Sequence, residues 1–183
     1  MENQRNLQPM FRQKAMDILR LTPPQEREST LIKCWMSHDA RWFMAVATEY
    51  GMQAANRLNQ TAAREVGKVE ARRILGALDL LPAKSLDDCL LFQEILISFA
   101  GPDLIEYDVV KTAENSYQVL VHRCFAHENV ERAGVAGQYE CGIFARVNGW
   151  FDTFGLSYSL TPPLGKCLKV QGRECRYSYE VNV

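Results

Sequence analysis

The sequence predicts an α+β protein: a helical N-terminal half packed on a C-terminal antiparallel sheet, with two further helices and a cysteine-rich terminal hairpin. Two observations lead to this prediction. Apolar residues recur at spacings of three and four over residues 10–100, the pattern of helices that bury one face. After Gly101-Pro102, short segments alternate between polar and apolar residues, as half-buried strands do.

Four helices are expected in the N-terminal half, bounded by residues that start or end helices. Pro24 suits the first turn of a helix, Gly51 interrupts the apolar pattern, and Ser85 can cap the N-terminus of the last helix. The expected helices cover residues 10–20, 25–50, 52–78 and 86–100.

The C-terminal half is expected to alternate strands with helices. The expected strands cover residues 105–109, 117–122, 166–170 and 174–181, and the expected helices cover 125–133 and 140–154. The last two strands would form a hairpin around Gln171-Gly172. We therefore expect a helical region over residues 1–101 and an α+β metal-binding region over 102–183, together forming one compact unit.

Composition argues against several classes of partner and location. The 183 residues include 47% hydrophobic residues, and 21 basic against 22 acidic residues leave a net charge of −1. A balanced charge offers no basic field for nucleic acid. The sequence has no run of 18 apolar residues to span a membrane and no apolar core of a signal peptide. We expect a cytoplasmic protein without nucleic-acid or membrane partners, whose six cysteines stay reduced.

Four cysteines of the C-terminal half are candidate metal ligands. Cys167 and Cys175 flank the expected hairpin, which would place their Cβ atoms about 4.5–5.5 Å apart. Cys124 and Cys141 stand at expected helix starts, where the helix dipole and free N–H groups lower a thiol pKa. Four thiolates suit one tetrahedral zinc. The alternative is that these side chains are simply buried apolar groups, because free cysteine is often buried.

The segment from Tyr139 to Tyr177 resembles the 4-vinyl reductase domain family. The resemblance rests on a cysteine that opens a helix and on a terminal motif of two cysteines with a glycine between them. The matching residues are Cys141, Cys167, Gly172, Cys175, Arg176 and Tyr177. Zinc-binding members of that family place an acidic ligand where this sequence has Leu164. The resemblance therefore implies a zinc site whose fourth ligand differs, with Cys124 as the natural replacement and His127, Glu128 or water as the others.

A second and looser resemblance covers about 150 residues. The Tyr139-x-Cys141 opening, Arg123-Cys124 after a strand and the leader His38-Asp39-x-x-Trp42 are similar to the L-2-amino-thiazoline-4-carboxylic acid hydrolase family. This resemblance implies hydrolysis of a C–N bond in a small sulfur heterocycle.

Polar residues of the helical half are candidates for catalysis and substrate binding. His38 and Trp42 share a helix face, and Asp39 adjoins them as a possible base. Asn56 and Asn59 lie one helical turn apart on the next helix, where they could contact a ligand. The alternative is that aromatic residues at this spacing form ordinary core.

Two histidines beside Cys124 extend this set. His127 is a candidate for proton transfer, and Glu128 is a candidate for substrate binding. Because His122 and His127 bracket Cys124, that cysteine is also a candidate nucleophile.

These observations lead to two hypotheses. The first is a zinc-dependent hydrolase of C–N bonds in a small heterocycle or cyclic amide, whose zinc keeps an open position for water. The second is a non-catalytic sensor or carrier that binds a small molecule and uses zinc for structure. Iron–sulfur clusters and copper(I) are less expected metals, although thiolates also bind them. A homodimer could form through a sheet edge or through the N-terminal helices.

Overall fold

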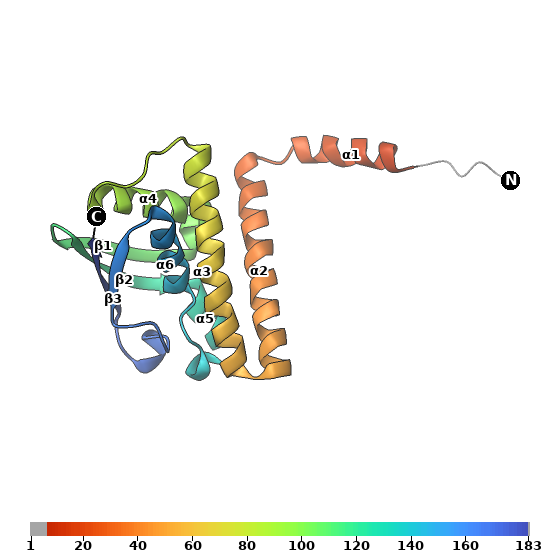
Figure 1. Cartoon of the computed structure of the whole chain (residues 1–183). Helices are drawn as coiled ribbons and strands as arrows, with labels where there is room; N and C mark the ends of the chain where they lie inside the picture. Colours follow the sequence, from red (N-terminus) through yellow and green to blue (C-terminus); the bar gives the residue numbers. More distant parts are fainter. Residues whose placement is uncertain (1–6, 183) are drawn as a thin grey trace. The chain divides into compact units, whose positions relative to one another are not determined.

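The structure is a computed structural model that describes residues 7–182 (Figure 1). Helices occupy the N-terminal half of the described chain and a four-stranded antiparallel sheet lies in the C-terminal half, which confirms the predicted α+β class. The helices are α1 (Gln8–Arg20), α2 (Pro24–Tyr50), α3 (Met52–Ala77), α4 (Leu86–Ala100), α5 (Phe125–Arg132) and α6 (Ile143–Phe154). The strands are β1 (Ile105–Ala113), β2 (Ser116–Cys124), β3 (Ser157–Thr161) and β4 (Cys175–Asn182).

The chain separates into two compact units, with the boundary between His38 and Asp39 inside α2. The first unit contains α1 and the beginning of α2, which starts at Pro24, one residue before the expected helix over 25–50. The second unit contains the remaining helices and the sheet. The expected division at residue 101 does not coincide with this boundary, because α3 and α4 belong to the same unit as the sheet.

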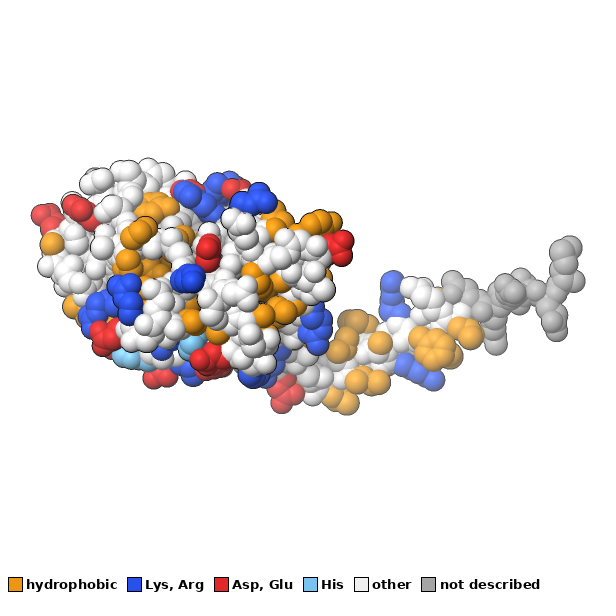
Figure 2. Space-filling view, turned by 90° about the horizontal axis from the view of Figure 1, so that it is seen from below, with side chains coloured by type: hydrophobic (Ala, Val, Ile, Leu, Met, Phe, Trp, Pro, Cys, Tyr) orange, Lys and Arg blue, Asp and Glu red, His pale blue; other side chains and the backbone are white. Residues whose placement is uncertain are grey.

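The sheet has the strand order β1-β2-β4-β3, and every pair is antiparallel. Buried and more exposed side chains alternate along β2 and β4, so one face of the sheet holds the core. Ser85 caps α4 by accepting a hydrogen bond from the Asp88 backbone N–H, as expected. On the face drawn in Figure 2, basic and acidic side chains are interspersed, in keeping with the balanced composition.

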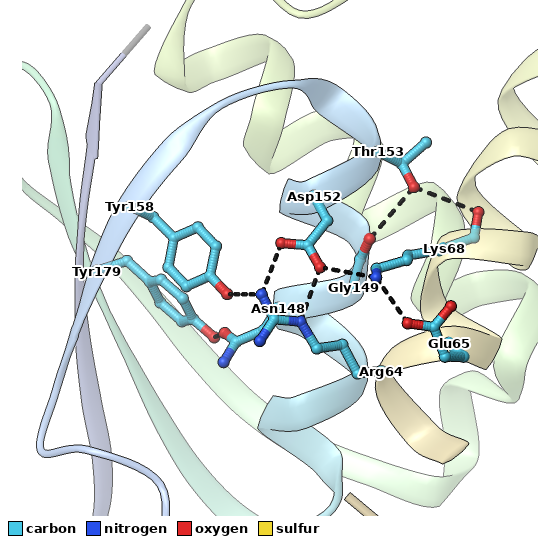
Figure 3. A network of polar contacts seen from close by, with 9 residues as sticks. All are labelled: Arg64, Glu65, Lys68, Asn148, Gly149, Asp152, Thr153, Tyr158 and Tyr179. Atoms are coloured by element: carbon cyan, nitrogen blue, oxygen red, sulfur yellow. Dashed lines mark hydrogen bonds and ion pairs between the residues drawn. The ribbon is translucent and has the colours of Figure 1, made fainter. Parts of the chain in front are cut away.

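Helix α6 lies at the centre of the second unit, with the core face of the sheet on one side and α3 on the other. Phe144 packs on Tyr177 with ring centroids 4.0 Å apart, and Phe151 packs on Tyr179 at 5.1 Å. The buried Tyr179 hydroxyl donates a hydrogen bond to Asn148 Oδ1 over 2.9 Å (Figure 3). A buried tyrosine therefore keeps a partner for its polar end, and α6 is tied to β4.

Helices α3 and α6 cross so closely that glycine is required on both. A Cβ atom on Gly67 would overlap the carbonyl oxygen of Arg146, and one on Gly149 would overlap the carbonyl oxygen of Arg64. The two backbones therefore meet without side chains between them. Both glycines lie inside helices and not in turns. Glycine is needed there because it lacks a Cβ.

A polar network holds the same crossing together at its margin (Figure 3). Arg64 Nε and Nη2 bind the two carboxylate oxygens of Asp152 at 2.7 and 2.8 Å, in the bidentate geometry typical of strong pairs. Lys68 Nζ lies 3.5 Å from Asp152 and 2.7 Å from Glu65. The hydrogen bond from Arg64 lowers the pKa of Asp152, so this carboxylate stays charged at neutral pH.

The predicted terminal hairpin is wrong. Residues 166–170 form no strand: Lys166 makes one isolated bridge to Glu140, and Lys169–Gln171 is a 3-10 turn that ends at Gly172. Gly172 adopts a φ of 69°, which favours glycine, and the turn closes before a strand could form. The neighbour of β4 on this side of the sheet is instead β3, a strand that the sequence reasoning missed.

Replacement of Gly67 or Gly149 by alanine is expected to lower the free energy of unfolding by about 1–3 kcal/mol, the usual cost of overpacking. Urea denaturation measures this loss. Gly76→Ala is the matched control, because it also lies in α3 and its added Cβ would meet nothing within 4 Å. This control should be neutral or stabilising, since alanine favours a helix by up to about 1 kcal/mol over glycine. Equal losses in all three variants would contradict the close crossing.

Candidate metal centre and ligand cavity

The four predicted cysteine ligands line one cavity of the second unit. This cavity has a volume of about 340 Å³ including its open mouth. Its cysteines are Cys124, Cys141, Cys167 and Cys175. All four thiols are free. The fold thus brings together four sulfur atoms from segments that are far apart in the sequence.

Each cysteine is positioned by a different piece of backbone. Cys124 is the last residue of β2 and the N-cap of α5, and Cys175 opens β4 opposite Val121 of β2. Cys141 precedes α6 and donates its N–H to Gly165 O over 2.8 Å, while Cys167 lies in the loop between β3 and β4. Cys167 and Cys175 are therefore not cross-strand neighbours, contrary to expectation, and they meet across a turn and a strand end instead.

His127 is the predicted catalytic residue that the fold places at this cavity. Its Nδ1 lies 4.0 Å from Cys167 Sγ, and its Nε2 lies 3.5 Å from the Glu131 carboxylate one turn along α5. In residues 7–182, no three His, Cys, Asp or Glu side chains are arranged so that they could hold a metal ion as they stand. The four thiols and His127 line the same cavity, but the thiols would have to turn toward a common point to share a metal.

The expected lowering of the thiol pKa at the helix starts is wrong. Burial raises the pKa of Cys141 to about 12, and it also raises the pKa of Cys124. Backbone N–H groups of Ile143 and Phe144 act in the opposite direction on Cys141, as a helix N-terminus should, but burial outweighs them. The pKa of Cys175 is likewise raised to about 12, by burial and then by the nearby thiols. Metal binding at this cavity would therefore displace protons.

Two asparagines predicted to bind substrate contact the loop that carries Cys141. Asn56 Nδ2 donates to Gln138 O over 2.7 Å, and its Oδ1 accepts from the Glu140 N–H over 3.1 Å. Asn59 lies against Gly142, where its Nδ2 occupies the space that a Cβ would take. Because both side chains come from α3, that helix holds the loop in place beside the cavity.

The other predicted site residues lie elsewhere. Trp42 is 67% exposed on α2, and Glu128 is half-buried on α5 with Arg123 at 3.8 Å. His38 and Asp39 are exposed and fall on either side of the boundary between the two units.

A second and larger cavity lies between the core face of the sheet and helices α4 and α6. Its volume is about 770 Å³ including its open mouth, and it is lined mainly by apolar side chains. Ile97 of α4, Val119 and Val121 of β2, and Val147 and Trp150 of α6 are representative of its wall. The sequence reasoning missed this cavity.

One polar residue in the wall of this second cavity stands out from its neighbours. Gln93 lies on the buried face of α4 together with Cys89, Phe92 and Leu96, and only 8% of its surface is exposed. A glutamine within an apolar helical stripe is the feature of the sequence that could have identified Gln93 as a functional residue.

Asn56→Leu is expected to lower the free energy of unfolding by about 1–3 kcal/mol, because it leaves two backbone groups of the Cys141 loop without partners. Thermal or urea denaturation would measure the loss. Asn129→Leu on α5 is the matched control, because it removes a hydrogen bond from the exposed Arg132 side chain, and it should cost less than about 0.5 kcal/mol. A similar small effect for both variants would contradict the role of Asn56.

Comparisons with known proteins identify one family. Residues 28–141 match the model of a family of unknown function (DUF6125). No curated protein matches the chain, and no solved structure matches it. Across residues 7–182, the structure contains no helix that is both long and apolar enough to cross a membrane. The family match covers more than half of the 183 residues, and the chain therefore belongs to the DUF6125 family.

Proposed function

We propose that this protein is a cytoplasmic small-molecule-binding module stabilised by one zinc ion. The observation that carries the zinc proposal is the convergence of four free thiols, from four separate segments, on one cavity. Four sulfur ligands and no open position are typical of structural zinc. A reducing compartment such as the cytoplasm would keep the thiols available.

The fourth ligand is proposed to be Cys124. Leu164, at the position where relatives of the resembled family have an acid, is half-buried and packs against the hydrophobic core. It can supply no metal ligand there. Cys124 lines the same cavity as the other three cysteines, and the pKa of Cys175 is raised by the charges of both Cys124 and Cys167. These relations favour a site of four cysteines over a site of three cysteines and water.

The second candidate function is a zinc-dependent hydrolase, and His127 is the observation that favours it. A histidine beside Cys167, with Glu131 on its other ring nitrogen, has the arrangement of a proton-transfer group. In that case zinc would keep three cysteines and a water, and would supply an activated nucleophile. The number of sulfur ligands separates the two candidates.

The proposed small-molecule site is the apolar cavity between α4, α6 and the sheet. Its mainly apolar wall with a few polar side chains is typical of ligand sites in general. It shares Ile105, Val121, Ile143 and Phe144 with the cysteine cavity. A metal on one side of this shared wall would hold the wall of the other cavity in place.

The zinc proposal predicts one zinc ion per chain after the reduced protein is stripped with a chelator and reconstituted. Because a structural metal is coupled to folding, the melting temperature should rise on reconstitution. X-ray absorption at the zinc edge should show four sulfur ligands at about 2.3 Å, whereas three sulfurs and one lighter atom would favour the hydrolase.

Cys175→Ser is expected to abolish stoichiometric zinc binding and the rise in melting temperature. Cys34→Ser is the matched control, because Cys34 is an exposed thiol outside the cavity and its loss should change neither. Absence of bound zinc in the reconstituted protein, or identical behaviour of the two variants, would overturn the zinc proposal.

A further inference from the structure

Gln93, a residue in the wall of the larger cavity, carries an unsatisfied hydrogen-bond donor. The buried Gln93 side chain accepts a hydrogen bond from the Tyr117 hydroxyl on Oε1, over 3.0 Å. Its Nε2 is buried and has no hydrogen-bond partner, and within residues 7–182 it is the one buried side-chain nitrogen or oxygen atom in this condition. Buried donors are nearly always paired, so an unpaired one in the wall of a cavity points to a partner supplied by a ligand.

The other polar side chains in the wall of this cavity, Tyr107, Arg146 and Trp150, are already paired with carboxylates. The Tyr107 hydroxyl donates to Glu94 over 2.5 Å. Arg146 forms a bidentate ion pair with Glu70, and Trp150 Nε1 donates to the same carboxylate over 3.4 Å. A ligand carboxylate would have to compete with Glu70 for Arg146. A ligand cation would lose its hydration against an apolar wall.

We infer that Gln93 selects a neutral, mainly apolar ligand that carries a hydrogen-bond acceptor such as a carbonyl oxygen. This inference rests on the proposed small-molecule site and adds its chemical class. The acceptor would receive the Gln93 Nε2 proton, while the remainder of the ligand would contact side chains such as Ile97 and Val147. The Tyr117 hydroxyl holds the amide in the orientation that presents Nε2, so Tyr117 is a positioning residue.

The test compares acetophenone with ethylbenzene, which have similar shapes but differ in the carbonyl oxygen. Binding to the full chain is measured by titration, with methyl NMR signals of Ile97 and Val147 used to locate the probe. The ratio of the two dissociation constants is measured in the wild type and in Gln93→Leu. The carbonyl preference should fall about tenfold in the variant, which corresponds to about 1.4 kcal/mol. Ethylbenzene binding should persist, which shows that the variant is folded.

Gln118→Leu is the matched control, because Gln118 lies on β2 outside the cavity and its Oε1 accepts from Arg176 over 3.3 Å. Its probe ratio should equal that of the wild type. In the wild type, the side-chain amide signal of Gln93 should shift with acetophenone and not with ethylbenzene, a measurement that does not depend on any variant.

The outcomes separate the two levels of the proposal. Unchanged methyl signals of Ile97 and Val147 with both probes would overturn the small-molecule site itself. Binding of both probes with the same ratio in the wild type and in Gln93→Leu, and with no shift of the Gln93 amide, would overturn the role of Gln93 and leave the site standing.

Discussion

The close crossing of α3 and α6 is the constraint on which the rest of the second unit depends. Gly67 and Gly149 let the two backbones touch, and the Arg64–Asp152 pair holds the margin of the contact. This approach leaves the opposite face of α6 to pack its aromatic rings on the sheet. Because α6 is fixed from both sides, the residues just before it and along it have defined positions.

Both cavities follow from the position of α6. The loop before its N-terminus carries Cys141 and is held by Asn56 of α3, while Phe144 in its first turn separates the two cavities. A metal centre and a ligand site would therefore share structural support. Asn56 and Asn59 of α3, which the sequence predicts as substrate ligands, contribute to this support.

Local patterns were sufficient to predict the helices, the first two strands and the identity of the four cysteines. They also predicted the last strand, over 174–181, which is present as β4, but not its partner: two cysteines flanking a glycine suggested a hairpin with residues 166–170. The turn at Gly172 reverses the chain within a few residues, and the partner of β4 comes from Ser157–Thr161 instead. Strand pairing depends on which distant segments the core brings together, and a single sequence does not contain that information in local form.

The sequence by itself determined the α+β class, the approximate extents of the helices and the set of thiols, because helical spacing, alternation and residue type are local properties. Only the tertiary structure decided that these four thiols line one cavity, that burial raises rather than lowers the pKa values of Cys124, Cys141 and Cys175, and that Gln93 retains an unpaired donor. The burial of the thiols and the pairing of the Gln93 side chain depend on elements that are distant in the chain. Desolvation, for example, depends on every segment that packs around a group.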